Sequence, residues 1–259
     1  MKKYLLSVLT FVIILSLTNC ELFIKSEYKE RTAMKDVIYP AGAFVTEWKT
    51  EVENESIALP FVGSGYYYCL INWGDGRTEM VDSNIGINNI HVYEKPGRHT
   101  VTITGHVDGW KFDQAGDSLK ITNVFQWGNL KPGAAVYECG YFEGCENLKI
   151  SAVDILDLSG VTRFDNMFFN CKSLTTVPSM NEWDVSGIES MFHMFDGASS
   201  FNQDIGSWDI RKVADMHSMF SDATSFNQDI SSWEIQAGAN VSFMFDNCGI
   251  DSNYKPVLP

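Results

Sequence analysis

The sequence has few basic residues, few cysteines and no long hydrophobic stretch. Its 259 residues carry 19 Lys and Arg against 33 Asp and Glu, which gives a formal net charge of -14. Binding of a phosphate backbone needs clustered Lys and Arg, so the composition argues against a nucleic-acid-binding protein. The longest uncharged apolar stretch, Tyr4–Leu17, is shorter than the about 20 residues that a membrane-spanning helix needs. The composition is otherwise that of a globular protein, with 45% hydrophobic and 13% aromatic residues.

The first twenty residues have the pattern of an export signal, because two lysines precede the apolar stretch. The segment Leu17–Cys20 (Leu-Thr-Asn-Cys) resembles a bacterial lipobox, in which cleavage leaves an acylated N-terminal cysteine. This resemblance implies a signal peptide over residues 1–19, lipidation of Cys20 and a tether over residues 20–43. We expect the lipid to hold the chain in the cell envelope, at the outer membrane or the cell surface. Ordinary secretion with cleavage nearby is the alternative.

Residues 44–127 have the composition of a β-rich module. The segment Gly65–Trp73 is rich in aromatic and β-branched residues, and Asp75-Gly76 after it favours a tight turn. Thr100–Thr104 alternates polar and apolar residues, as a half-buried strand does. Several short strands separated by turn signals indicate an all-β sandwich.

The motifs of this module resemble those of the polycystic-kidney-disease (PKD) domain. They are Trp-Gly-Asp-Gly at 73–76, His-Val-Tyr at 91–93 and Pro-Gly at 96–97. The resemblance implies an immunoglobulin-like sandwich that serves as an extracellular spacer or binding module. Within the first motif, Asp75 is either a turn residue or a calcium ligand, and we favour the turn.

The second half of the chain repeats itself about every 25 residues. Five phenylalanines mark the repeats: Phe142, Phe168, Phe195, Phe220 and Phe245. The segment Ser200–Ile205 recurs almost unchanged as Ser225–Ile230. Each unit is expected to contain a short apolar–acid–apolar strand and a helical piece with apolar residues at i, i+3 and i+4, as at Met191, Met194 and Phe195. Such units must stack to bury their apolar faces, and the spacing predicts an α+β leucine-rich-repeat-like solenoid over residues 128–259.

These repeats resemble those of the BspA-like leucine-rich-repeat surface proteins of bacteria. The family signature M-F-x-x-A-x-S-F-N-Q-D-I-x-x-W-D-V-S-x-V-x-x-M matches Met194–Met219 nearly throughout, and again from Met219 to Ile235. The last unit departs from it at residues 236–238. The resemblance implies surface exposure, adhesion and binding of a protein or of an extracellular-matrix-type ligand. It implies no catalytic activity.

One acid stands in the expected strand of each of four successive units. They are Asp157, Asp184, Asp209 and Glu234. On a strand face these carboxylates would stack and repel one another unless cations or a partner relieved the repulsion. The sequence therefore offers them as a ligand face for a basic protein surface or a divalent cation. A solvated repeat pattern without a ligand is the alternative.

For the residues at two other repeated positions, we prefer a structural role over contact with a ligand. Asn202 and Asn227, with the Gln and Asp residues that follow each, are expected to bond internally from repeat to repeat. The tryptophans Trp183, Trp208 and Trp233 are expected to fill the core, although exposed ones would suit carbohydrate stacking.

The cysteines and histidines suggest no enzyme. Cys145 and Cys171 occupy the same position of adjacent units, where a disulfide and a pair of buried free thiols are both feasible. We find no nucleophile–base arrangement, no phosphate loop and no pattern for a bound metal or cofactor. The sequence thus predicts a non-catalytic, lipid-anchored surface protein that binds proteins or mediates adhesion. The alternatives are an envelope or periplasmic scaffold and a carbohydrate-binding module.

Overall fold

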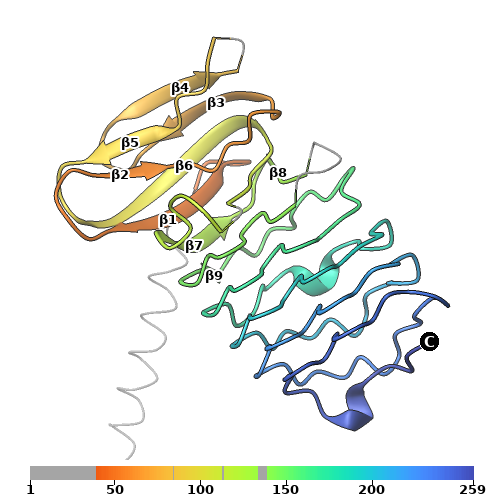
Figure 1. Cartoon of the computed structure of the whole chain (residues 1–259). Helices are drawn as coiled ribbons and strands as arrows, with labels where there is room; N and C mark the ends of the chain where they lie inside the picture. Colours follow the sequence, from red (N-terminus) through yellow and green to blue (C-terminus); the bar gives the residue numbers. More distant parts are fainter. Residues whose placement is uncertain (1–38, 84, 113, 134–138) are drawn as a thin grey trace, which may run out of the picture. The chain divides into compact units, whose positions relative to one another are not determined.

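The computed structural model describes residues 39–83, 85–112, 114–133 and 139–259 (Figure 1). The predicted signal peptide, most of the predicted tether and Cys20 lie outside these residues. Ala41–Pro259 form one compact unit. The division of this unit into modules at residue 128 stays a prediction.

Strands dominate the first part of the chain, and two 3-10 helices of three residues are the helical segments of the described part. The strands are β1 (Phe44–Thr50), β2 (Glu55–Ala58), β3 (Tyr67–Asn72), β4 (Thr78–Asp82), β5 (Ile90–Tyr93), β6 (Gly97–Asp108), β7 (Ile121–Gln126), β8 (Leu130–Lys131) and β9 (Lys149–Ile150). The 3-10 helices are η1 (Met180–Glu182) and η2 (Ser252–Tyr254).

Seven strands form one mixed sheet. Its order is β4-β3-β6-β1-β7-β9, with β8 paired to β6. The pairs among β1, β3, β4, β6 and β7 are antiparallel, whereas β6–β8 and β7–β9 are parallel. Strands β2 and β5 form a separate antiparallel pair. The parallel β7–β9 pair joins the sheet to the first repeat, so both belong to one body.

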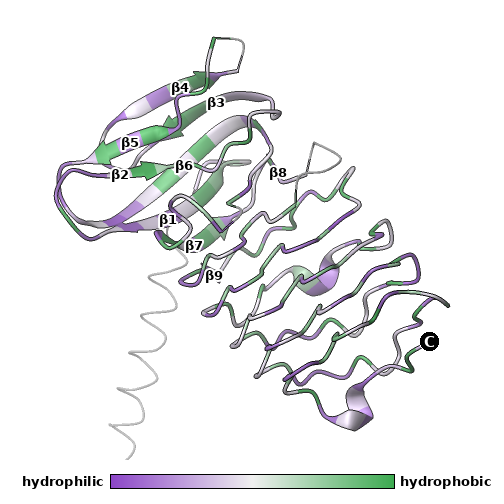
Figure 2. Cartoon of the chain, viewed as in Figure 1, coloured by the Kyte–Doolittle hydropathy of each residue, from purple (hydrophilic) through white to green (hydrophobic). Residues whose placement is uncertain are grey.

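The hairpin predicted around Asp75-Gly76 is confirmed as the β3–β4 connection. Gly74 and Gly76 both have left-handed φ values, and a side chain on Gly74 would meet the carbonyl oxygen of Thr100. Along β3 the residues alternate between buried and exposed, as expected for a strand with one face on the core. Figure 2 shows hydrophobic residues distributed both along the strands and through the turns of the repeat region.

The repeat region, residues 139–251, is built from consecutive turns. The predicted helical pieces are wrong, because Met191, Met194 and Phe195 lie in turns and not in a helix. The predicted apolar–acid–apolar strands are also wrong, since the segment around Asp184 has no strand pairing. Isolated parallel bridges link successive units, at Arg163, Ser190, Asp215 and Asn240.

Two left-handed residues in every unit explain why no helix forms. They stand two residues before and two residues after the marker phenylalanine. The earlier positions are Gly140, Asn166, His193, Ser218 and Phe243, and the later ones are Gly144, Asn170, Gly197, Asp222 and Asn247. A right-handed helix cannot pass through such residues, so the apolar i, i+3, i+4 pattern is satisfied by turns.

Around the marker phenylalanines, the backbone hydrogen bonds between units run in one direction, whereas elsewhere they run back to the preceding unit, as from the N–H of Asn202 to the carbonyl of Thr175. From each unit, alternate N–H groups donate to carbonyl oxygens of the following unit, three between the first pair and four between each later pair. The N–H of Phe195, for example, donates to Met219 at 2.9 Å. The intervening N–H groups close local turns, as Met194 does onto Met191. We call this set of bonds the turn ladder.

The turn ladder places the marker phenylalanines face to face. Their ring centroids are 5.9, 5.8, 5.6 and 5.8 Å apart in succession, with interplanar angles of 13, 15, 9 and 4°. These rings and the methionines beside them are buried, except for Phe245 in the last unit, which is partly buried. Burial of each large apolar side chain stabilises the fold by about 1.5–3 kcal/mol.

The predicted fold class, an immunoglobulin-like sandwich followed by an α+β solenoid, is therefore wrong. The described residues are nearly all sheet and turn, with no α-helix among them. One mixed sheet carries most strands, and the repeats contribute β9 alone to it. The physical reason for the error lies in the left-handed residues, which turn the expected helices into turns.

Substitution of Gly197 tests this explanation. Gly197 has a left-handed φ of +69°, and in Gly197→Ala the new Cβ would lie 2.2 Å from Oδ1 of Asn170. We expect the free energy of unfolding to fall by about 1–3 kcal/mol, as measured by urea denaturation. Gly187→Ala is the control, because that glycine has no left-handed φ and no atom within 4 Å of the position that a Cβ would take. Equal losses in both variants would contradict the explanation.

Candidate interaction surface

The four acids of the predicted ligand face, here called the acid ladder, lie in turns and not on a strand face. Asp157, Asp184 and Asp209 each accept a hydrogen bond from the N–H two residues later, at 2.9, 3.1 and 3.3 Å. This is the Asx-turn arrangement, in which an acid fixes the local backbone. The predicted strand face is absent from the described residues, and the ligand-binding role of the acids stays a prediction.

Two of these acids have a cation nearby. Arg211 binds Asp209 through two nitrogens, at 2.8 and 2.6 Å, and Lys131 lies 3.7 Å from Asp157. The Arg211 hydrogen bond lowers the pKa of Asp209 to about 2. Hydrogen bonds from Ser186 lower the pKa of Asp184, while the charge of Asp209 acts in the opposite direction. The repulsion that stacking would cause is therefore relieved partly within the chain.

The structure brings the later acids of the ladder together. Asp209 and Glu234 line a shallow hollow of about 290 Å³ with Trp208, Arg211 and Ser232. Neither Asp157 nor Asp184 lines this hollow. The hollow is polar and open, which suits contact with another protein better than enclosure of a small molecule.

The tryptophans of the repeats are core residues, as predicted. Trp183, Trp208 and Trp233 are 4, 5 and 4% exposed. The indole N–H of Trp208 donates to the carbonyl of Met180, and that of Trp233 to the carbonyl of Ile205. Since their faces are covered, these rings offer no stacking platform for a sugar.

Asn202, Asn227 and the Gln residues that follow them, here called the amide ladder, also bond internally, as predicted. Oδ1 of Asn202 accepts from the N–H of Asn227 and from the side chain of Gln228, both at 2.9 Å. Oδ1 of Asn227 accepts in turn from the N–H of Asp251. These amides connect units, and their oxygens are used for that purpose.

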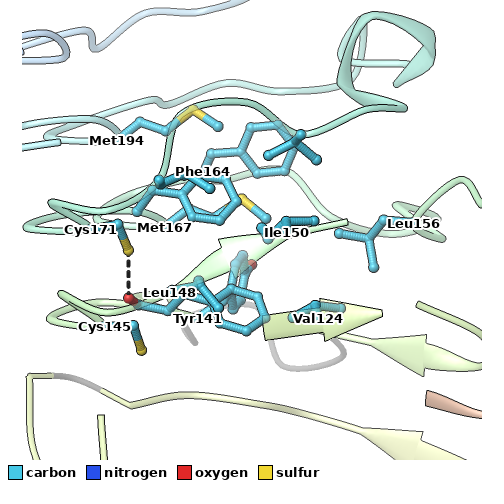
Figure 3. Packing of buried hydrophobic residues seen from close by; sticks show 14 of the residues in the cluster. Val124, Tyr141, Cys145, Leu148, Ile150, Leu156, Phe164, Met167, Cys171 and Met194 are labelled. Carbon is cyan, nitrogen blue, oxygen red and sulfur yellow. Dashed lines mark hydrogen bonds between the residues drawn. The ribbon is translucent and has the colours of Figure 1, made fainter. Parts of the chain in front are cut away.

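The cysteines are free thiols in the described part of the chain. Cys145 and Cys171 lie buried on successive turns, and the thiol of Cys171 donates to the carbonyl of Phe142 at 3.1 Å (Figure 3). Burial raises the pKa of both thiols far above the ordinary value. Ala198 and Ala223 fill the same position in later units, so small size is what this position requires.

Asp75 is a turn residue that also supports the strands. Its carboxylate accepts from the N–H of Arg77 at 3.0 Å and pairs with His91 at 2.8 Å. His91 stacks on Trp73, with ring centroids 4.8 Å apart. No group of three or more His, Cys, Asp or Glu residues suited to a metal occurs among residues 39–83, 85–112, 114–133 and 139–259. The same residues include no helix long and apolar enough to span a bilayer.

A row of aromatic and imidazole rings was missed by the sequence analysis. It crosses the turns of four successive units and comprises Phe169, Phe192, His193, His217 and Phe243. We call it the ring row. Phe192 and His217 stand three residues before the marker phenylalanine of their units, and His193 and Phe243 stand two residues before it. The other units hold no ring at these two positions, so the repeat pattern does not mark them. A surplus of rings in the otherwise polar turn positions was the available signal.

Comparison with known proteins finds similarity in the repeat region alone. Residues 139–255 match the family described as "Mycoplasma protein of unknown function, DUF285". This range begins at the first turn unit and ends beside η2, so it coincides with the stacked turns. No curated protein and no solved structure matches the chain. The match therefore supports the extent of the repeat region and says nothing about its activity.

The Asp209–Arg211 pair gives a prediction that can be checked by NMR. We expect the carboxyl group of Asp209 to titrate near pH 2, because the guanidinium stabilises the charged form. In Arg211→Gln the pKa of Asp209 should rise towards the ordinary aspartate value. The pKa of Asp229, which hydrogen bonds from Ser231 lower, should stay unchanged and serves as the internal control. An unchanged pKa of Asp209 would show that the pair does not exist in solution.

Proposed function

We propose that this chain is a lipid-anchored bacterial surface protein that binds other proteins or mediates adhesion through its repeat region, without catalysing a reaction. The lipobox-like segment that ends at Cys20 supports the anchor. The PKD-like and BspA-like motifs support an exported interaction protein. The match to DUF285 is neutral, because that family is described as having unknown function.

The observation that carries the binding proposal is the open hollow beside the acid ladder. Asp209 and Glu234 reach it from successive units whose backbones are tied together by hydrogen bonds. Because this backbone is already ordered, little of its conformational entropy is lost when a partner binds. Acidic side chains around an open surface favour a basic protein partner through complementary charge.

Two other functions are less well supported. A periplasmic or envelope scaffold would use the same stacked turns without an external ligand, and cellular location separates it from a surface protein. A carbohydrate-binding module would need exposed ring platforms in the repeats, whereas the three repeat tryptophans are buried.

Protease treatment of intact cells tests the location. We expect external protease to remove the chain while a periplasmic control protein survives, because a surface anchor leaves the folded part outside. Detection of both proteins by immunoblot is the measurement. Survival of the chain until the envelope is broken would place it inside and favour the scaffold function.

Charge reversal tests the acid ladder. We expect Asp184→Lys with Asp209→Lys to weaken binding of a small basic probe protein, cytochrome c, several-fold in surface plasmon resonance. The matched control is Asp204→Lys with Asp229→Lys, which makes the same charge change at exposed Asx-turn acids outside the ladder. Equal losses in both double variants would show that net charge alone holds the probe. Unchanged binding in the ladder variant would exclude the ladder as the contact surface.

A further inference from the structure

The ring row is a continuous set of ring contacts on the surface of the turns. Phe192 packs against His193 with centroids 4.1 Å apart and stacks on His217 at 5.4 Å and 15°. Phe169 meets His193 at 5.9 Å, and Phe243 meets His217 edge-on at 5.6 Å. All five rings are partly or fully exposed, and Phe243 is 65% exposed.

Phe243 is a residue that folding does not explain. Its φ of 57° lies in the left-handed region, where a bulky side chain is unfavourable. The equivalent positions of the other units hold Gly140, Asn166, His193 and Ser218, which include the residues best suited to that conformation. Its exposure means that core packing does not repay the unfavourable conformation. A strained and exposed aromatic residue points to a contact with something outside the chain.

The excess of acidic residues around the ring row favours a cationic partner. Residues 189–251 contain ten Asp and Glu but two basic residues, Arg211 and Lys212. Both cations act on the acid ladder, where they stabilise the charge of Asp209. Beside the ring row, the carboxylate of Asp196 is bound by His193 at 2.5 Å and feels the negative charge of Asp222.

We propose that the ring row binds arginine-rich segments of a partner protein. The planar guanidinium group stacks on aromatic faces and pairs with carboxylates, so it uses both features of this surface. Exposed Phe243 offers the free ring, and Asp196 and Asp222 supply the negative charge. Lysine has a compact ammonium group that is more strongly hydrated, so it gains less from the rings. The inference rests on the proposed protein-binding function but assigns it a second face, separate from the acid ladder.

Peptide binding tests this inference. The probes are an oligoarginine peptide and an oligolysine peptide of equal length, titrated calorimetrically into the purified protein at physiological salt. We expect the arginine peptide to bind several-fold more tightly than the lysine peptide. In Phe243→Ser the affinity for the arginine peptide should fall roughly fivefold while the affinity for the lysine peptide changes little. Phe192→Ser should act in the same direction.

The choice of serine keeps the folded state intact. Ser218 occupies the position of Phe243 in the preceding unit with φ 51°, and Ser242 occupies the position of Phe192 in the last unit. We therefore expect the urea midpoint of Phe243→Ser to be unchanged or raised. Val153→Ser is the matched control, because Val153 is an 80% exposed apolar residue outside the ring row.

The acid-ladder variant separates this inference from the proposed function. The ring-row inference would be overturned if both peptides bound equally well, if this binding were lost in Asp184→Lys with Asp209→Lys, and if it were kept in Phe243→Ser. Protein binding at the acid ladder would then still stand. If Val153→Ser lost the preference for the arginine peptide as Phe243→Ser does, the ring-row inference would also be overturned. If neither peptide bound, the ring-row inference would be overturned. The proposed function would still be tested separately by the binding of cytochrome c. Loss of selectivity in Phe243→Ser and Phe192→Ser alone would support the ring-row inference.

Discussion

The hydrogen bonds of the turn ladder are the interaction on which the repeat region depends. Each unit gives alternate N–H groups to the next unit, at 2.8–3.0 Å. A net contribution of about 1 kcal/mol per bond makes the ladder a large part of the stability of the region. The same bonds fix the register of the units, so that equivalent side chains lie directly over one another. The acid ladder, the amide ladder and the stacked rings of the marker phenylalanines all follow from this register.

The sheet closes one end of the stacked turns. β7 pairs with β9, and the ring of Trp127 meets Phe142 at 5.9 Å, so the first unit is covered by apolar and backbone contacts. The carboxylate of Asp154 accepts from the N–H groups of Trp127 and Gly128 at 2.8–3.1 Å, which ties the same junction. Repeat units cannot bury their faces alone, and stacked arrays therefore need such a cap. A single buried cluster runs from the sheet into the turns as a result.

The sequence was sufficient to predict what repeats and what is buried, because a ladder repeats its residues. The 25-residue period, the buried tryptophans and the internal bonds of Asn202 and Asn227 were all predictable for that reason. The helices were wrongly predicted because the apolar spacing of Met191, Met194 and Phe195 is shared by helices and by consecutive turns. The glycines and asparagines on both sides of each marker phenylalanine held the missing information, since these residues accept a left-handed backbone.

The candidate interaction surface was harder to predict, because it depends on which positions of different units meet in space. The pairing of Asp209 with Arg211 is local and could have been found from their spacing of two residues. The ring row is different, since Phe169 and His193 meet although they come from unlike positions of two units. Only the register of the turn ladder brings them into contact. Sequence repetition alone therefore finds the ladders of equivalent residues and misses the contacts that run across them.

The turn ladder also has an electrical polarity of its own. Its peptide dipoles point the same way and add, as they do along an α-helix, whereas the bonds that run back to the preceding unit, as from Asn202 to Thr175, oppose them. At the acceptor end, the carbonyl of Glu143 already takes a hydrogen bond from the N–H of Gln114. At the donor end, four N–H groups have no acceptor among the residues the structure describes: Val241, Phe243, Phe245 and Asn247. A partner that continues the turn ladder would therefore have to present carbonyl or carboxylate oxygens to these four N–H groups.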